Sequence, residues 1–302
     1  MPIKIIQTKD NPYISIIIPS RDGDRSGNVK KIIDDLNKQT FTDFEIIIAI
    51  AKRPNGHARN VGVTKAKGQL FLFIDDDALL GSSDMLEKTI AVFNNDTKKE
   101  IGLVGSATLL PPDSNKFQKW QAREIDRSEF FPVTELTESD MAHHLFVATR
   151  AETWHAIDGE NSNLETGTDM DLRNKIKERG LKIVIAPTIF AYHPLAKDLK
   201  SFLKQNFWYG SGIPILRFYW PEQHQISSKM QACKWGLKYT LLYPLLIFKY
   251  NRSAPWSFNI LKATGKLFRE IGYSFGYFKY VNFLKELPKK KQMPAQNKSI
   301  LN

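Results

Sequence analysis

Three consecutive carboxylates, Asp75, Asp76 and Asp77, follow a run of five apolar residues at 70–74. An uncharged apolar run of that length predicts a strand that is buried on both faces. In an extended chain alternate side chains point the same way, so Asp75 and Asp77 can face one ion or ligand while Asp76 turns aside. Adjacent acids repel one another, and a divalent metal ion is the simplest partner that would hold them. The alternative is a solvated acidic turn that caps the next helix.

A second acidic group, Asp169 and Asp171, stands well downstream, where Gly167 or Thr168 can cap a helix. Acids in the first turn of a helix and bases in its last turn are favourable helix chemistry, which by itself requires no catalytic role. The pair at 143–144, two histidines in a predicted strand over 143–149, is a third candidate. Adjacent residues on a strand point to opposite faces, so we interpret this pair as structural rather than as joint ligands.

These residues need a scaffold, and the first hundred residues read as alternating strands and helices. Buried strands are predicted over 14–20, 44–51 and 68–74. Helices are predicted over 29–36, 57–67 and 85–93, and a further strand over 102–110. Three strand–helix repeats imply right-handed crossovers and a parallel sheet, so the loops 20–25, 52–57 and 75–77 share one sheet edge. Neither a Gly-x-Gly-x-x-Gly nor a P-loop motif is present, which argues against a dinucleotide-binding Rossmann unit and against a P-loop enzyme.

A series of short pieces in this region resembles the family 2 glycosyltransferases. The pieces are Ile-Ile-Ile-Pro-Ser at 16–20, Gln-Thr at 39–40, Asp-Phe-Glu-Ile-Ile at 43–47, Ala-Arg-Asn-Val-Gly at 58–62, Gly68, and Phe-Ile-Asp-Asp-Asp at 73–77. Their order and spacing together are specific, and the resemblance covers roughly residues 12–195. It implies an α/β protein with the glycosyltransferase A (GT-A) fold. That fold has a Rossmann-like, mostly parallel sheet flanked by helices, followed in this chain by C-terminal amphipathic helices.

In the family the last piece is the DXD motif, which binds a divalent metal that holds the diphosphate of a nucleotide-sugar. The resemblance makes Asp77 the main metal ligand and places Asp75 against the metal or the ribose, with Mn²⁺ or Mg²⁺ as the cofactor. Such an ion prefers oxygen ligands and acts as a Lewis acid on the leaving diphosphate. By the same resemblance His193, six residues after Pro187, would complete the metal site or contact the diphosphate.

The remaining donor-binding residues are expected in the loop after the first strand and beside the acids. They are Pro19, Ser20, Arg21, Asp22, Arg59, Asp75 and Asp76. Arg59, at the start of a helix, would either add positive charge to the pyrophosphate or form a surface salt bridge with Asp34 or Asp35. The family commonly has an Asp that binds the base at the end of the second strand, but here Ala51 and Lys-Arg-Pro at 52–54 stand there. Base recognition must therefore differ, through backbone groups or Asp22, and the nucleotide stays open.

The downstream acids match the family's Glu-Asp motif, which is followed by Asp-Leu and Arg, then Gly, then a strand that ends in Pro. The matching residues are Asp169, Asp171, Leu172, Arg173, Gly180 and Pro187, whereas Thr168 replaces the usual Glu. The match makes Asp169 the general base. It would take a proton from an acceptor hydroxyl, whose oxygen attacks the anomeric carbon opposite the diphosphate and inverts its configuration. Thr168, Trp208 and Tyr209 are the expected acceptor-side residues.

The net charge of +11 is concentrated at the C-terminus. From residue 226 onward there are 14 basic and two acidic residues, against 29 and 30 before it. Aromatic residues mixed with lysines over 235–250 and 260–287, with Lys-Lys-Lys at 289–291, are typical of helices in a membrane interface. The apolar runs are too short to span a bilayer. The alternatives are a helical cap packed on the body and a nucleic-acid patch, and the apolar content argues against nucleic acid.

We therefore predict a donor half at 1–112, an acceptor half at 113–222 and a membrane-associated helical tail at 223–302. The segment 113–141 is polar and irregular, as substrate lids often are. The lone Cys233 excludes an internal disulfide and fits a reducing compartment, and no signal peptide opens the chain.

The predicted activity is metal-dependent, inverting glycosyl transfer to a glycan or lipid-linked acceptor in polysaccharide synthesis, at the cytoplasmic face of the cell membrane. Two alternatives stay open. One is a nucleotidyltransferase acting on sugar phosphates, which would release pyrophosphate and would not need a base placed like Asp169. The other is a non-catalytic, membrane-bound scaffold with a degenerate donor site.

Overall fold

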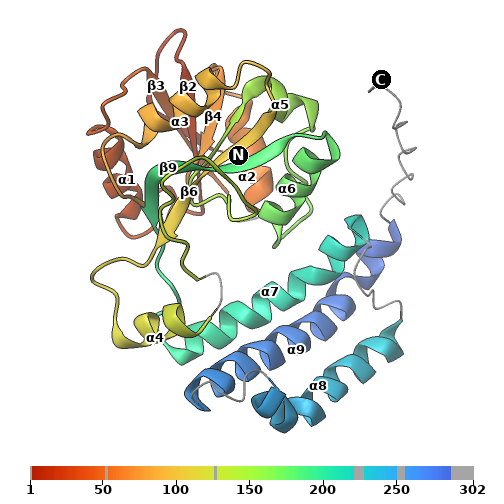
Figure 1. The fold of residues 1–302 in the computed structure, drawn as a ribbon. Helices are drawn as coiled ribbons and strands as arrows, with labels where there is room; N and C mark the ends of the chain where they lie inside the picture. Colours follow the sequence, from red (N-terminus) through yellow and green to blue (C-terminus); the bar gives the residue numbers. More distant parts are fainter. Residues whose placement is uncertain (1, 52–53, 126–127, 221–227, 250–255, 287–302) are drawn as a thin grey trace, which may run out of the picture.

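The computed structural model describes residues 2–51, 54–125, 128–220, 228–249 and 256–286. Figure 1 shows an α/β unit with a central sheet flanked by helices and, beneath it, a layer of three long helices. These helices are α7 (Leu199–Tyr219), α8 (Lys229–Lys249) and α9 (Trp256–Glu286). The α/β class predicted from the sequence is confirmed. Residues 52–53 of the predicted sheet-edge loop and the lysines at 289–291 of the predicted membrane-associated tail lie outside the described residues.

In the described part of the chain nine strands form one sheet, in the order β1-β3-β2-β4-β8-β6-β9-β5 with β7 beside β9. The strands are β1 (Ile3–Gln7), β2 (Ile14–Ser20), β3 (Phe44–Ile50), β4 (Leu70–Phe73), β5 (Leu79–Leu80), β6 (Ile101–Leu109), β7 (Thr137–Glu138), β8 (Val147–Arg150) and β9 (Lys182–Tyr192). Strands β3, β2 and β4 are parallel, as are β6 and β9. The other pairs are antiparallel, so the prediction of a mostly parallel sheet is wrong and the sheet is mixed. The strand–helix repeats that predicted parallel pairing end at α3, and the later strands β7 and β8 pair antiparallel to their neighbours.

The shorter helices are α1 (Asn28–Leu36), α2 (Asn55–Val63), α3 (Met85–Asn95), α4 (Lys116–Glu124), α5 (Ala151–Ala156) and α6 (Thr168–Glu178). Helix α4 corrects the expectation that 113–141 is irregular throughout. The Asn115 side chain accepts a hydrogen bond from the Gln118 N–H (2.9 Å), and the Gln118 side chain accepts one from the Asn115 N–H (3.0 Å). This reciprocal capping box starts a helix in a segment whose polarity suggested a loop. The strand predicted over 143–149 begins only at Val147.

The central strands are buried on both faces, so the core consists of an apolar cluster on each face of the sheet. On β2, Ile16 and Ile18 pack into a cluster with α1 and α3, whereas Ile17 packs into the opposite cluster. Phe71 and Phe73 of β4 lie in the same cluster as Ile17. Side chains that alternate between two apolar layers fix the register of β2 and β4. The loops after these strands, including the acids at 75–77, are thereby held at one edge of the sheet.

Glycines allow α7 and α9 to pack at close range. A Cβ atom at Gly210 of α7 would collide with the main-chain carbonyl of Arg269, and one at Gly272 of α9 with that of Phe207. The aromatic, glycine-rich part of α7 is therefore shaped by its contact with α9. Across the described ranges, no helix combines the length and apolar character that a membrane crossing requires.

Candidate active site

A cavity of about 490 Å³ lies where the loop after β4, the N-terminus of α6 and helix α7 meet. Most of the residues predicted from the sequence line it: Arg59, Asp75, Asp76, Asp77, Thr168, Asp169, His193, Trp208 and Tyr209. The predicted residues at 19–22 are not among the residues that line it. The structure thus brings the donor-side acids and the predicted base into one cavity, although they are far apart in the sequence.

The three consecutive acids point to different partners. Asp76 is 9% exposed and accepts a hydrogen bond from the Ser20 hydroxyl (2.7 Å), so it turns aside as predicted. Burial raises the pKa of Asp76. Arg25, a residue the sequence analysis did not single out, pairs with Asp77 Oδ2 (2.9 Å) and lies 3.7 Å from Asp76 Oδ1. A cation therefore does lie beside the acids in this structure, and it is an arginine of the chain itself.

Local hydrogen bonds shape the loop that presents Arg25. The Oδ1 atom of Asp22 accepts hydrogen bonds from the N–H groups of Asp24 (3.0 Å) and Arg25 (2.8 Å). These bonds hold the pKa of Asp22 below its ordinary value. Of the other predicted loop residues, Pro19 is buried in β2 and Arg21 is exposed. Asp22 therefore acts as a turn residue in this structure.

Arg59 is buried rather than placed at the surface. Its side chain is 2% exposed, and Nη2 pairs with Asp75 Oδ1 (2.6 Å) while Nη1 pairs with Glu160 Oε2 (3.1 Å). The alternative of a surface salt bridge with Asp34 or Asp35 is wrong, because the first turns of α2 face the interior. The charge of Arg59 is shared between a cavity acid and a buried glutamate that the sequence analysis missed.

His193 directly follows β9 and lies near Asp77. Its main-chain N–H donates to the Leu109 carbonyl (2.9 Å), and its Nε2 lies 3.9 Å from Asp77 Oδ1. The third predicted ligand, Asp75, is held by Arg59. Among the described residues, no three His, Cys, Asp or Glu side chains are grouped closely enough to form a metal site. The structure brings two of the three predicted ligands near one another.

Asp169 lies in the first turn of α6, which begins after Gly167. Gly167 has a φ of +79°, a left-handed conformation that favours glycine. The Oδ1 atom of Asp169 lies 2.5 Å from His144 Nδ1 and accepts a hydrogen bond from the His144 main-chain N–H (2.8 Å). Burial raises the pKa of this carboxyl, but the charge of His144 outweighs it and holds the pKa well below the ordinary value. Asp169 is therefore an ionised carboxylate at neutral pH.

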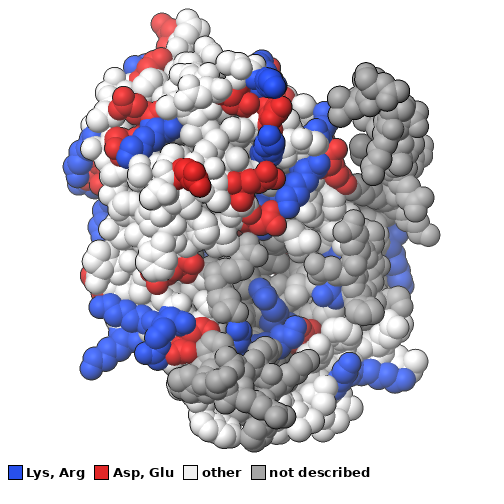
Figure 2. Space-filling view, in the orientation of Figure 1, with Lys and Arg blue, Asp and Glu red and all other residues white. Residues whose placement is uncertain are grey.

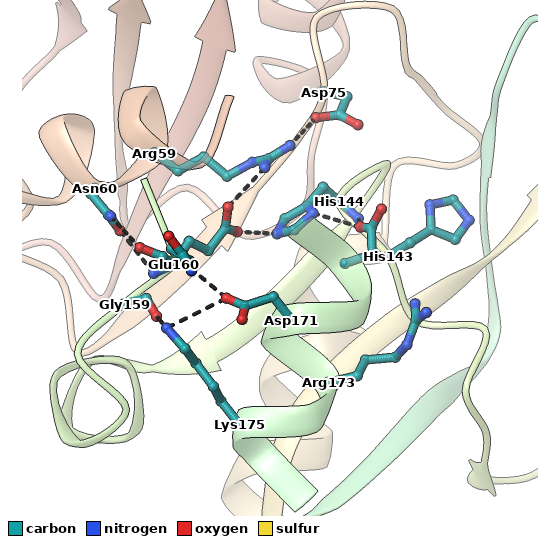
Figure 3. Close-up of polar contacts among 12 residues, drawn as sticks. Arg59, Asn60, Asp75, His143, His144, Gly159, Glu160, Asp171, Arg173 and Lys175 are labelled. Carbon is teal, nitrogen blue, oxygen red and sulfur yellow. Dashed lines mark hydrogen bonds and ion pairs between the residues drawn. The ribbon is translucent and has the colours of Figure 1, made fainter. Parts of the chain in front are cut away.

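His144 is enclosed between two carboxylates, as Figure 3 shows. Its Nδ1 contacts Asp169, its Nε2 contacts Glu160 Oε1, and its side chain is 1% exposed. Burial and Arg59 lower the pKa of His144, but the two carboxylates outweigh them and raise it to about 9. The neighbouring His143 differs, since burial lowers its pKa to about 4. We interpreted both histidines as structural, yet His144 directly contacts the predicted base.

The other residues of the second motif hold the loop before α6. Asp171 is 1% exposed and accepts hydrogen bonds from Trp220 Nε1 (2.9 Å) and the Asn161 N–H (3.2 Å). Arg173 donates to the Ala142 carbonyl (2.9 Å). These contacts fix the positions of the segments that carry Glu160 and His144. Asp171 and Arg173 of this motif therefore have a structural role in their local contacts.

Helix α7 supplies the remaining wall of the cavity. Its lining residues include Ser201, Lys204, Gln205, Trp208 and Tyr209. The Tyr209 hydroxyl accepts a hydrogen bond from Gln205 Nε2 (3.2 Å), and burial raises its pKa. The predicted acceptor-side aromatics are thus part of the cavity.

With this geometry in place, comparisons with known proteins assign the family. A family model described as "Glycosyltransferase like family 2" matches residues 11–211, and the chain belongs to this family. The chain is 25% identical over 206 residues to the hyaluronan synthase of Pasteurella multocida and, to the same extent, to the chondroitin synthase of its strain Pm70. Each match covers 60% of this chain and 20% of the relative, so this chain matches only a fifth of the curated relatives' length.

Among solved structures, the chain resembles a mannosyltransferase from Pyrobaculum calidifontis in complex with GDP-Man and Mn²⁺. The sequence identity is 12% and the TM-score 0.47, over 90% of this chain and 76% of that one. The family and the GT-A fold predicted from the sequence are confirmed. Helices α8 and α9 lie beyond the residues that the family model matches.

Proposed function

We propose that this chain is a metal-dependent, inverting glycosyltransferase that moves a sugar from a nucleotide-sugar to a hydroxyl acceptor. One observation carries the proposal: Asp77, in the loop after β4, and Asp169, at the start of α6, line the same cavity. Glycosyl transfer needs neutralisation of the leaving diphosphate and a base for the acceptor hydroxyl. A nucleotidyltransferase would not need a base in the position of Asp169.

Asp77 and His193 are the residues that would hold Mn²⁺ or Mg²⁺. Their Oδ1 and Nε2 atoms lie 3.9 Å apart, which two ligands of one ion can span when each bond is about 2.1 Å long. The donor set fits such an ion, because carboxylate oxygen is its preferred ligand and imidazole is an acceptable one. When bound, the ion would supply Lewis-acid stabilisation of the diphosphate. Asp75 is proposed to contact the ion or the ribose while it remains paired with Arg59.

Asp169 is proposed as the general base. Its Oδ1 atom is engaged by His144, so Oδ2 is the atom that would take the proton of the acceptor hydroxyl. The deprotonated oxygen attacks the anomeric carbon as the bond to the diphosphate breaks. Attack from the face opposite the leaving group inverts the anomeric configuration. The cavity position, the helix N-terminus and the lowered pKa of Asp169 all favour an ionised carboxylate that is ready to accept the proton.

The donor would lie against the loop after β2 and the acids after β4. Ser20 contributes through its hydrogen bond to Asp76, and Asp22 contributes by shaping the turn that presents Arg25. Pro19 and Arg21 flank this turn. Backbone groups of this loop, or Asp22, are proposed to recognise the base in place of the acid that the family commonly has after the second strand.

The acceptor would approach along α7. Trp208 and Tyr209 offer aromatic faces that suit a sugar ring, and Thr168 offers a hydroxyl beside Asp169. The two curated relatives are named as synthases of hyaluronan and chondroitin, which supports a glycan as the acceptor. A glycan or a lipid-linked sugar is therefore the proposed acceptor class.

The tail is proposed to place the enzyme on the cytoplasmic face of the cell membrane, through one face of α8. That face carries Met230, Leu237, Leu241 and Leu245, which are 61–68% exposed. The other face of α8 packs on α9, where Trp235 Nε1 donates to Glu270 Oε2 (2.5 Å). A helix that is apolar on both faces is normally buried, so the outer face calls for a partner.

The charge of α8 suits an anionic lipid surface. The helix contains four lysines and no acidic residue, and lysines beside an apolar stripe are typical of interfacial helices. Figure 2 shows acidic and basic side chains interspersed over the sheet unit, whereas basic side chains predominate over the helices below it. Helix α9 has a different part in this proposal, because it lies between α7 and α8 and holds both.

A thermal-shift panel tests the activity class. UDP, GDP, UDP-glucose, UDP-N-acetylglucosamine, GDP-mannose and UTP would each be added to the full chain, with and without Mn²⁺. A glycosyltransferase is stabilised by a nucleoside diphosphate or a nucleotide-sugar, and more strongly when Mn²⁺ is present. A response to the triphosphate alone would favour a nucleotidyltransferase, and no response to any nucleotide would favour a non-catalytic scaffold.

A further inference from the structure

A line of alternating charges runs through the interior from the donor side of the cavity to the predicted base. Asp75 pairs with Arg59, Arg59 with Glu160, Glu160 with His144, and His144 with Asp169. The three inner residues, Arg59, Glu160 and His144, are almost completely buried, at 1–3% exposure. Both ends of the line and Arg59 border the cavity, whereas Glu160 and His144 do not. Figure 3 shows the successive contacts from Asp75 through Arg59 and Glu160 to His144.

We propose that Glu160 and His144 are positioning residues that orient Asp169 for proton transfer. The inference rests on the proposed role of Asp169 as the base. It assigns a role to two residues that neither touch the substrate nor line the cavity. Four observations support it.

The first observation is the charge of the His144 ring. Both ring nitrogens lie against carboxylate oxygens, Nδ1 against Asp169 and Nε2 against Glu160. A neutral imidazole would direct one unprotonated nitrogen at a carboxylate, which is repulsive. Only the doubly protonated ring satisfies both sides. His144 is therefore a buried cation that is held by one carboxylate while it orients the other.

The second observation is the asymmetry of Asp169. Its Oδ1 receives both the ring nitrogen and the main-chain N–H of His144. Within the described residues, no hydrogen bond or ion pair engages Oδ2. Two contacts on one oxygen fix the rotation of the carboxylate and leave the other oxygen free for a proton. Without these two contacts, the Asp169 side chain could adopt several rotamers.

The third observation is that Glu160 is itself held on three sides. The Asn60 side chain donates to the Glu160 carbonyl (2.7 Å) and accepts from the Glu160 N–H (3.0 Å), while Arg59 pairs with its carboxylate. Gly56 leaves the space that the carboxylate occupies, since a Cβ there would lie 2.8 Å from Oε2. The α2 segment thus builds a fixed site for Glu160.

The fourth observation is the balance of charge. Two cations, Arg59 and His144, are interleaved with three carboxylates along the line. Removing one member of a buried ion pair leaves the other uncompensated, which is far more costly than the pair itself is worth. Loss of the His144 charge would leave Glu160 and Asp169 facing one another, and Asp169 would turn away or take up a proton. Either change removes the base without removing the donor site.

The test compares His144→Gln and Glu160→Gln with the native chain. Turnover is measured as release of UDP or GDP from UDP-glucose, UDP-N-acetylglucosamine or GDP-mannose with Mn²⁺, and nucleotide affinity by titration with UDP or GDP and Mn²⁺. We expect kcat to fall by about tenfold to a hundredfold, as for residues that orient a reacting group. Nucleotide affinity should stay within about twofold. Glu45→Gln is the matched control, because Glu45 is a buried carboxylate on β3 whose partners, Ser15 and the Lys67 N–H, lie outside the charged line.

Three results would overturn the inference: native kcat in both variants, a fall of kcat that is no larger than in Glu45→Gln or is matched by an equal fall of nucleotide affinity, or failure of both variants to fold. If only Glu160→Gln folds, the same changes in kcat and nucleotide affinity in that variant decide the inference. The proposed function is tested separately by Asp169→Asn. Full activity in that variant would reject the base itself, whereas an inactive Asp169→Asn beside an active His144→Gln would reject only the positioning role.

Discussion

The Nε2 atom of His193, after β9, lies 3.9 Å from the Oδ1 atom of Asp77, after β4. The sheet brings these two residues together because β9 and the loop after β4 end at the same edge. If they share a metal ion, removing the imidazole should weaken metal-dependent nucleotide binding without abolishing it. His193→Ala is expected to lower the affinity for UDP or GDP with Mn²⁺ by about tenfold or more, as one lost ligand would.

Calorimetric titration with and without Mn²⁺ checks this prediction. His143→Ala is the control, because its Nε2 is hydrogen-bonded to Thr108 Oγ1 (2.9 Å) and it is not among the cavity-lining residues. Equal Mn²⁺-dependent affinity in His193→Ala and the native chain would remove His193 from the metal site.

Arg25 pairs with Asp77 and would compete with the proposed metal ion for this carboxylate. Its guanidinium pairs with Asp77 Oδ2 (2.9 Å) and is about half exposed. An exposed ion pair is worth up to about 1 kcal/mol, so Arg25→Gln should raise the affinity for Mn²⁺ alone by about two- to fivefold. Titration with Mn²⁺ in the absence of nucleotide measures the effect, with Arg21→Gln as the control in the same loop. An unchanged or weakened affinity in Arg25→Gln would contradict the competition.

The raised pKa of His144 predicts a pH-dependent contribution to folding stability. The pKa is about 9 in the folded chain and about 6.5 in an unfolded one. A group whose pKa is raised on folding stabilises most below its unfolded pKa, and the contribution is lost as pH rises through the folded value. The melting-temperature difference between the native chain and His144→Gln should therefore be largest below pH 6.5 and shrink between pH 6.5 and 9.

Melting curves from pH 6 to 10 for both proteins measure this difference. His155→Gln, an exposed histidine on α5, gives the baseline. A difference that is constant over this range, or that grows with pH, would show that His144 is not a buried cation.

The exposed face of α8 predicts binding to anionic lipid. The double variant Leu237→Gln and Leu241→Gln should reduce co-sedimentation of the full chain with phosphatidylglycerol-containing vesicles by about tenfold or more, since each buried CH₂ contributes about 0.8 kcal/mol. Phe131→Gln is the control, because Phe131 is 70% exposed and lies outside α8. Undiminished binding by the α8 variant would assign the membrane contact to another part of the tail. Absence of binding by the native chain would reject the membrane partner altogether.

Much of the first half of the fold followed from apolar runs and their spacing. The strands β2, β3 and β4 begin and end within two residues of their predicted limits, because their burial on both faces leaves a continuous apolar run. Helix α4 was missed because a capping box in a polar segment gives no apolar periodicity. The position of α7 against α9 depends on backbone contact at Gly210 and Gly272, which no pattern of side chains encodes.

The cavity residues were predictable where a family motif carries them, as for Asp77 and Asp169. The interior of the site was not. Glu160 lies in a loop whose composition is unremarkable, and its role depends on the distant Arg59. His144 was interpreted as structural because period-two alternation assumes a strand, whereas β8 starts three residues later. Glu160 and His144 are linked by a buried ion pair, and this pair forms only when the chain folds.

The most direct test of the proposed function distinguishes the role of Asp169 from the role of Asp77. Asp169→Asn and Asp77→Ala are compared for release of UDP or GDP from nucleotide-sugars with Mn²⁺, and for Mn²⁺-dependent binding of UDP or GDP. Asp169→Asn should lose turnover by about 10²–10⁴-fold while it binds nucleotide as the native chain does, because only the base is removed. Asp77→Ala should lose both. Native turnover in Asp169→Asn, or native Mn²⁺-dependent nucleotide binding in Asp77→Ala, would contradict the proposal.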